Sequence, residues 1–159
     1  MRWLASALIA LALIRPAAGQ EPVGCDKFKW PLDHERAMLA AAVPAQTNAA
    51  PLKASYRLTL AADAKQPLPP TRTPKAGGHG GAVNLAAPDK AGIYRVTLSE
   101  AGWIDIFQNG TALKPGSFTG AVGCPGLRKS VKFNLIAEPL VVEISGAAAA
   151  SISFVITPD

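Results

Sequence analysis

The sequence predicts a mainly β protein, an antiparallel β-sandwich or jelly roll of about eight strands with one short N-terminal helix. Three observations lead to this fold class. Apolar and polar residues alternate along much of the chain after residue 54, turn signals separate these stretches, and no helical crossover lies between them. Alternation with period two is typical of antiparallel strands with one solvated face, and the lack of crossovers argues against a parallel α/β sheet.

Five stretches show the alternation most clearly, and we expect their apolar members to face the core. These members are Tyr56, Leu58, Leu60, Tyr94, Val96, Leu98, Val131, Phe133, Leu135, Leu140, Val142, Ile144, Ile152, Phe154 and Ile156. Shorter strands are expected around residues 83–85 and at Phe118. Residues 103–108 form another expected strand, and Asn109-Gly110 follows it. Because Asn and Gly tolerate the positive φ of a type I′ turn, this dipeptide predicts a hairpin that pairs 103–108 with 111–113.

A helix and a loop complete the expected elements. The helix is expected over residues 32–42, where alanines favour helical backbone, Asp33 can act as the cap, and Leu32 and Leu39 can share one face. Residues 65–81 are rich in Pro and Gly and include Gly77-Gly78-His79-Gly80-Gly81. Pro lacks a backbone donor and Gly costs conformational entropy, so we expect a mobile loop there, with at most an edge strand at its start.

The first nineteen residues have the organisation of a signal peptide. Arg2 supplies a positive start, and residues 4–14 form an apolar stretch that is too short for a stable membrane anchor. Ala17-Ala18-Gly19 then offers small residues for cleavage before Gln20. The alternative is an uncleaved anchor or a buried helix. We therefore expect residues 20–159 to form one periplasmic or secreted domain, with no transmembrane segment after cleavage.

Charge and cysteine content narrow the class of protein further. Loss of Arg2 and Arg15 would leave fourteen Lys and Arg against eleven Asp and Glu, a formal charge of +3. Nucleic-acid binding needs a more concentrated basic face, so no nucleic-acid partner is expected. Cys25 and Cys124 are the two cysteines, and an even pair in an oxidising compartment predicts a disulfide. A metal or redox pair is the alternative, but Cys-x-x-Cys spacing and a nearby histidine are missing.

The sequence offers no motif for catalysis or metal binding. No serine stands in a Gly-x-Ser-x-Gly motif, and the two histidines, His34 and His79, have no partner marked by spacing. A zinc or copper site needs three or four converging ligands, which two isolated histidines do not supply. We therefore expect a protein that is not an enzyme and that holds neither a cofactor nor a metal ion.

Four residues on two expected strands are candidates for ligand binding: Tyr94, Arg95, Trp103 and Asp105. An exposed aromatic surface with polar groups beside it would stack on sugar rings. The alternative is that Trp103 lies in the core, as most large aromatic side chains do. Asp105 is polar within an apolar run, so we expect it to pair across strands with Arg95 or Arg57.

A candidate basic patch follows Cys124-Pro125-Gly126 and consists of Arg128, Lys129 and Lys132. It would suit an acidic partner, lipid head groups or polyanionic sugars, although such clusters are commonly solvated strand ends. Together these features predict a non-enzymatic exported binding module whose partner is a glycan or an envelope protein. The alternative is a small inhibitor or chaperone-like partner of an envelope enzyme that acts through a loop. A hydrolase of unrecognised type is a third possibility.

Two resemblances accompany this interpretation. Gly92-Ile93-Tyr94-Arg95-Val96-Thr97-Leu98, Trp103-Ile104-Asp105-Ile106 and the closing strands at 140–156 resemble the bacterial pre-peptidase C-terminal type of β-sandwich. That resemblance covers residues 56–157 and implies a non-catalytic accessory module of secreted enzymes. The whole chain, with its Cys-Asp-x-Phe-x-Trp and Cys-Pro-Gly-x-Arg-Lys segments, also resembles small uncharacterised exported proteins of proteobacteria. Neither resemblance supplies catalytic residues.

Overall fold

The computed structural model describes residues 20–46, 49–73 and 76–159, so the predicted signal peptide 1–19 lies outside the described residues. The strands are β1 (Val43–Pro44), β2 (Ser55–Thr59), β3 (Ala61–Ala62), β4 (His79–Leu85), β5 (Gly92–Leu98), β6 (Trp103–Gln108), β7 (Thr111–Ala112), β8 (Phe118–Gly120), β9 (Lys129–Leu135), β10 (Leu140–Ala147) and β11 (Ser151–Pro158). A single-turn 3-10 helix (Cys25–Lys27) and the helix α1 (Asp33–Ala40) precede them.

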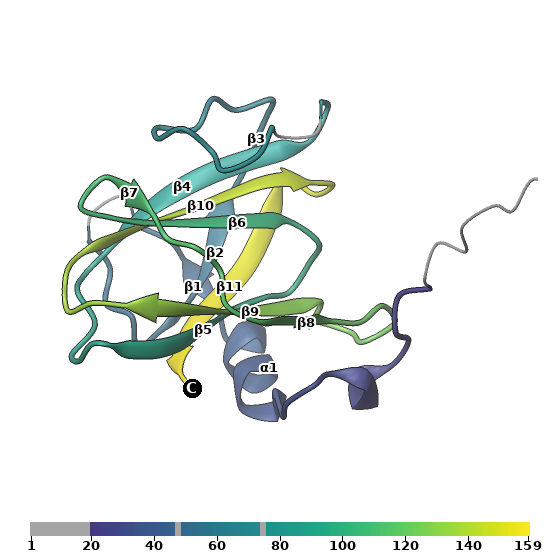
Figure 1. The fold of residues 1–159 in the computed structure, drawn as a ribbon. Coiled ribbons are helices and arrows are strands. Elements are labelled where there is room, and N and C mark those ends of the chain that lie inside the picture. The colour runs from purple at the N-terminus through teal and green to yellow at the C-terminus, as the bar shows by residue number, and fades with distance from the viewer. Residues whose placement is uncertain (1–19, 47–48, 74–75) are drawn as a thin grey trace, which may run out of the picture.

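The strands form two sheets that pack face to face, which confirms the predicted sandwich (Figure 1). One sheet has six strands in the order β1-β2-β11-β5-β9-β8, and the other has five in the order β3-β4-β10-β6-β7. All of these pairings are antiparallel except that of β1 with β2. The strands β1 and β3 have two residues each, which is too short for an alternating pattern to reveal.

The core lies between the sheets and contains all fifteen side chains that the alternation predicts to face inward. Alternation therefore identifies the inner face of both sheets correctly. The consecutive strands β10 and β11 lie in the interior of different sheets, β10 between β4 and β6 and β11 between β2 and β5. The chain thus changes sheet at residues 147–151, and this connection joins the interiors of the two layers.

The predicted hairpin is confirmed. Asn109 and Gly110 have φ values of 50° and 71°, as a turn with two left-handed residues requires. β6 pairs with β7, and the Leu113 N–H donates to the Ile106 carbonyl at 2.8 Å.

Helix α1 covers the outer face of the six-stranded sheet (Figure 1). Leu32 and Leu39 pack there against Leu127 and Val155, as their shared face predicts. The predicted disulfide is present and joins Cys25 to Cys124 across 99 residues of sequence. It ties the segment before the helix to the loop before β9. The helix is shorter than expected and begins at Asp33, and the capping position is Leu32, which has no side-chain hydrogen bond, so the prediction of an Asp33 cap is wrong.

The Pro-rich segment, residues 63–73, lies on the outer face of the five-stranded sheet, and we call it the strap (Figure 1). Its half-buried residues alternate as in a strand and are Ala64, Gln66, Leu68 and Pro70. The glycine-rich end of the expected loop differs from the prediction, because His79-Gly80-Gly81 is the first part of β4. These residues pair with β10 and β3, which supply the partners that stabilise an otherwise unfavourable glycine-rich strand.

Gly110→Val tests the hairpin. The space around Gly110 is open, so a new side chain meets no atom within 4 Å, and only the positive φ opposes it. We expect a loss of about 1–2 kcal/mol in the free energy of unfolding, the range for strained backbone positions. Gly92→Val is the matched control, since a Cβ there also meets nothing within 4 Å and φ is not positive. Equal urea midpoints for the two variants would contradict a φ-controlled turn.

Candidate functional site

The four candidate ligand-binding residues do not share one surface. Tyr94 lies in the core, and its hydroxyl donates to the Lys90 carbonyl at 2.8 Å. Arg95, the next residue on β5, therefore lies on the outer face of the six-stranded sheet. Trp103 and Asp105 lie on the outer face of the five-stranded sheet, because Ile104 between them faces the core. Arg95 and Asp105 thus stand on opposite sides of the sandwich.

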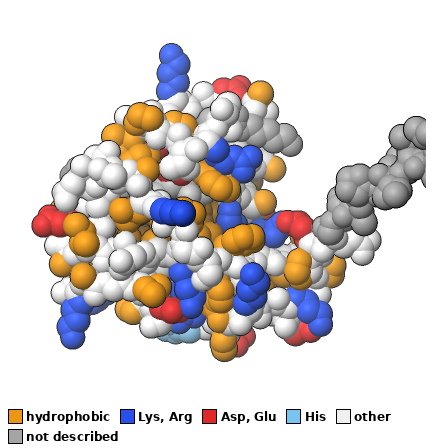
Figure 2. Space-filling model, viewed as in Figure 1, with side chains coloured by type: hydrophobic (Ala, Val, Ile, Leu, Met, Phe, Trp, Pro, Cys, Tyr) orange, Lys and Arg blue, Asp and Glu red, His pale blue; other side chains and the backbone are white. Residues whose placement is uncertain are grey.

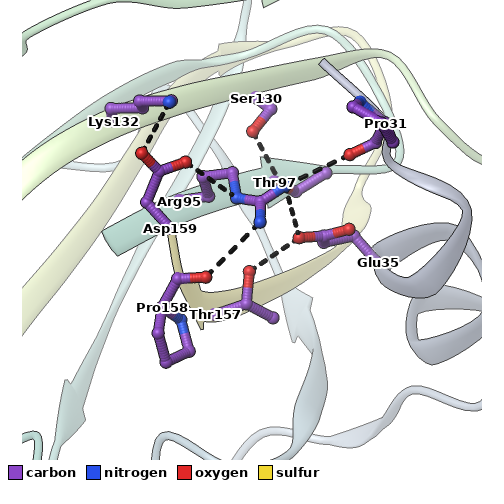
Figure 3. Close-up of polar contacts among 9 residues, drawn as sticks. All are labelled: Pro31, Glu35, Arg95, Thr97, Ser130, Lys132, Thr157, Pro158 and Asp159. Carbon is purple, nitrogen blue, oxygen red and sulfur yellow. Dashed lines mark hydrogen bonds and ion pairs between the residues drawn. The ribbon is translucent and has the colours of Figure 1, made fainter. Parts of the chain in front are cut away.

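Arg95 fastens helix α1 to the sheet (Figure 3). Its Nη1 atom lies 3.2 Å from Glu35 Oε1 of the helix, and its Nε atom lies 3.3 Å from Asp159 Oδ1. Glu35 is only 2% exposed, and the Thr157 hydroxyl donates to the same Oε1 atom at 2.8 Å. A buried carboxylate is tolerated where a cation and hydrogen bonds satisfy it, as here. This arrangement gives Arg95 a structural role in the docking of the helix.

The three residues of the candidate basic patch divide between two places: Arg128 and Lys129 line one cleft, whereas Lys132 does not. Lys132 lies on the helix side, 2.7 Å from Asp159 Oδ2, with its ammonium group 4.6 Å from the centre of the Trp30 ring. Arg128 forms an ion pair with Glu21, in which Nη2 donates to both carboxylate oxygens, at 2.8 and 2.7 Å. Lys129 lines a cleft at the margin of the two sheets.

Asp105 is buried beneath the strap and finds its partners there. It accepts hydrogen bonds from the Thr71 hydroxyl and from Trp103 Nε1, the latter at 3.1 Å. The expected partners, Arg95 and Arg57, belong to the other sheet, so the predicted cross-strand pair is wrong. The sequence did not predict Thr71 as the partner of Asp105. A Pro-rich segment shows no alternation of residue types, so the residues that it places against a sheet cannot be inferred.

Trp103 is half-buried on the surface and is not part of the core. Its ring lies under two cations, with the Arg72 guanidinium 4.5 Å and the Lys129 ammonium 5.2 Å from the ring centre. Its indole N–H is engaged by Asp105 and by the Thr71 hydroxyl at 3.3 Å. Cations therefore already contact the ring surface that would stack on a sugar.

A cleft of about 720 Å³ opens between the start of β6 and the strands β8 and β9. Its wall combines apolar side chains with two cations, and the main contributors are Trp103, Ile104, Phe118, Val131, Arg128 and Lys129. Phe118 is 62% exposed, which is unusual for a large aromatic side chain. On the face shown in Figure 2, hydrophobic side chains and Lys or Arg side chains lie next to one another. Phe118 was expected only as part of a strand, because a lone aromatic residue carries no sequence signal of exposure.

Lys129 is a partly buried cation of this cleft. Burial lowers the pKa of its ammonium group, and repulsion by Arg128 and Arg72 lowers that pKa further, while Asp105 opposes the change. The ammonium group donates to the Gly102 carbonyl at 2.9 Å. An additional carboxylate in the cleft would therefore offset both the desolvation of Lys129 and the repulsion around it.

Glu143 of β10 lies directly opposite Asp105 of β6 in the pairing register and is 1% exposed. The Leu68 N–H of the strap donates to Glu143 Oε1 at 2.8 Å. Burial raises the pKa of the Glu143 carboxyl above its ordinary value of 4.5; the Leu68 hydrogen bond opposes this shift and the charge of Asp105 adds to it. The strap therefore covers two neighbouring carboxyl groups.

Comparison with protein-family models, curated proteins and solved structures gives no match to this chain. The resemblance to the pre-peptidase C-terminal sandwich stays a hypothesis. Over the described ranges, no three His, Cys, Asp or Glu side chains converge as metal ligands. No helix among the described residues is long and apolar enough to cross a lipid bilayer.

Glu143→Gln tests the electrostatics beneath the strap. A carboxyl group whose pKa is higher in the folded than in the unfolded chain stabilises the fold at low pH and loses this contribution as pH rises through the folded pKa. We therefore expect the wild-type free energy of unfolding to fall, relative to that of Glu143→Gln, as pH rises from below 4.5 toward neutrality. Urea titrations of both proteins over this range measure the difference. A difference that stays constant with pH would exclude a raised pKa.

Proposed function

We propose that this protein is a non-enzymatic, exported binding module that holds a segment of an envelope protein in the cleft between β6 and β8. The observation that carries the proposal is the composition of the cleft, which is lined by an exposed phenylalanine, Phe118, and by a half-buried tryptophan, Trp103. Exposed aromatic anchors within a concave apolar surface are a common feature of protein interaction sites.

The charges around the cleft favour an acidic partner. Arg128 and Lys129 line it, and the Lys29 ammonium group lies over the Phe118 ring, 5.3 Å from the ring centre. One acidic side chain among the lining residues, Glu21, balances Arg128. The pKa of Lys129, lowered from its ordinary value by burial and by neighbouring cations, supports a bound carboxylate at that position. The expected occupant is therefore an apolar side chain with Asp or Glu beside it.

A glycan is a weaker candidate for the cleft. Stacking on a sugar requires an open aromatic face, whereas the Trp103 ring is contacted by Arg72 and Lys129. The inhibitor alternative requires a protruding loop, whereas hydrogen bonds to Glu143 and Asp105 hold the strap against its sheet. The Cys25–Cys124 bond supports export, because such bonds form and persist in oxidising compartments.

Selection of displayed random dodecapeptides on the purified, oxidised protein tests this function. We expect enriched sequences to place Asp or Glu next to an aromatic or aliphatic residue. The enriched peptides are then synthesised, and their affinities are measured by fluorescence anisotropy. Phe118→Ser and Lys129→Gln should each weaken binding about tenfold, which corresponds to the loss of one anchor contact.

Ile93→Ser is the matched control, because Ile93 is 53% exposed and lies at the start of β5, away from the cleft. It should leave both affinity and the urea midpoint unchanged. Selection without enrichment, or peptides whose affinity Phe118→Ser does not alter, would overturn the proposed cleft function.

A further inference from the structure

A second cavity, separate from the cleft, lies where the strap meets the start of β4 and the end of β10. Its volume is about 350 Å³, and its lining includes Gln66 of the strap, His79 of β4 and Ser145 of β10. Three buried side-chain atoms on this lining, Gln66 Oε1, His79 Nδ1 and Ser145 Oγ, have no hydrogen-bond partner among the described residues. Ser145 is only 3% exposed.

The fold brings these atoms together from the strap, from β4 and from β10. Gln66 Nε2 donates to the Ile144 carbonyl at 3.3 Å, which places its Oε1 atom next to β10. Gly80 allows this close approach, because a Cβ at that position would overlap the Gln66 amide. Glu143, two residues before Ser145 on the same face of β10, carries a further buried oxygen, Oε2, without a partner among the described residues.

A buried polar atom without a partner destabilises the fold, so such atoms are uncommon in proteins. Three of the six unpartnered buried side-chain atoms in the described part of the chain, Gln66 Oε1, His79 Nδ1 and Ser145 Oγ, belong to residues that line this cavity. An arrangement that is unfavourable for the empty fold becomes favourable when a ligand supplies the missing hydrogen bonds.

The donors and acceptors define the chemistry of that ligand. Gln66 Oε1 accepts, because its amide nitrogen already donates to a carbonyl, whereas Ser145 Oγ and the His79 ring can each donate or accept. Hydroxyl groups match this mixture, because each can donate one hydrogen bond and accept others. The lining carries one carboxylate, Asp63, which accepts from the Gly77 N–H, and one cation, Lys65. This balance favours a neutral ligand over a metal ion or an anion.

We infer that this cavity binds a neutral, hydroxyl-rich molecule of monosaccharide size. Its volume lies at the lower end of the range for small-molecule sites. Adjacent hydroxyl groups of the ligand donate to Gln66 Oε1 and His79 Nδ1 and accept from the Ser145 hydroxyl. The site is independent of the proposed peptide cleft, which shares none of these residues. The ligand is either a free sugar or the terminal residue of a longer glycan.

Nuclear magnetic resonance titration tests the inference. The Gln66 side-chain amide and the His79 ring nitrogens are followed while glucose, galactose, mannose, N-acetylglucosamine and inositol are added in turn. We expect saturable shifts for at least one of them, with a dissociation constant on the order of 1 mM, as ligand efficiency gives for about twelve non-hydrogen atoms. The affinity for glucose is compared with that for maltotetraose, and the affinity for N-acetylglucosamine with that for its tetramer. These comparisons show whether the cavity prefers a free sugar or the terminal residue of a glycan.

Ser145→Ala separates binding from folding. Because the Ser145 hydroxyl has no partner among the described residues, its removal should leave the urea midpoint of the free protein unchanged or raised. The same variant should weaken sugar binding about threefold to tenfold, the loss of one neutral hydrogen bond. His79→Ala should weaken sugar binding similarly, and the double variant should show no saturable shift.

Phe118→Ser is the control for independence and should leave sugar binding unchanged, just as Ser145→Ala should leave peptide binding unchanged. Absence of saturable shifts with every sugar, the result expected if water alone occupies the cavity, overturns the inference. So does saturable binding that Ser145→Ala and His79→Ala leave unaltered. Neither result bears on the peptide cleft, so failure of one proposal is distinguishable from failure of the other.

Discussion

The requirement that buried polar groups find partners governs the outer faces of both sheets. Each face carries a fully buried carboxyl group, Glu35 beneath the helix side and Glu143 beneath the strap. Glu35 is satisfied by the Arg95 guanidinium and the Thr157 hydroxyl, so the ion pair that attaches α1 also makes the burial of its carboxylate tolerable. Removal of that cation would leave an unpaired buried charge, which is a far larger penalty than the loss of a surface ion pair.

On the strap side, the buried carboxyl group is only partly satisfied by hydrogen bonds. Glu143 receives one backbone hydrogen bond through Oε1, whereas Oε2 has no partner among the described residues. Neutral hydrogen bonds from Leu68 and Thr71 replace the ion pair of the helix side. The two faces therefore satisfy their most deeply buried carboxyl groups differently: an ion pair and a hydroxyl group satisfy Glu35 on the helix face, whereas on the strap face Glu143 keeps one oxygen as unused capacity for hydrogen bonding. Such capacity is expected where a protein meets a ligand, because structure alone gives no reason to keep it.

Much of the fold could be predicted from the sequence, because period-two alternation records which side chains enter the core. The Asn109-Gly110 turn was also predictable, since few dipeptides tolerate two positive φ values. The candidate functional site was harder to predict from the sequence. Alternation shows that Arg95 and Asp105 point outward but not what covers them, so the helix network and the strap contacts could not be assigned. The strap also could not be placed on the sheet from the sequence, because its residue types do not alternate: Gln66 is polar and half-buried, whereas Pro67 and Pro69 are apolar and exposed.

The lengths of the strands at the margins of the sandwich affect whether copies of the chain associate through their strand edges at high concentration. The strands at the margins of the two sheets, β1, β8, β3 and β7, have only two or three residues each, and β1 includes a proline. A free strand edge of normal length presents a row of amide and carbonyl groups that recruits another chain into a growing aggregate. Margins this short offer too few consecutive groups to template such growth. Three of the longest strands, β5, β10 and β11, each lie between two neighbours in the interior of a sheet, which shields them from such growth.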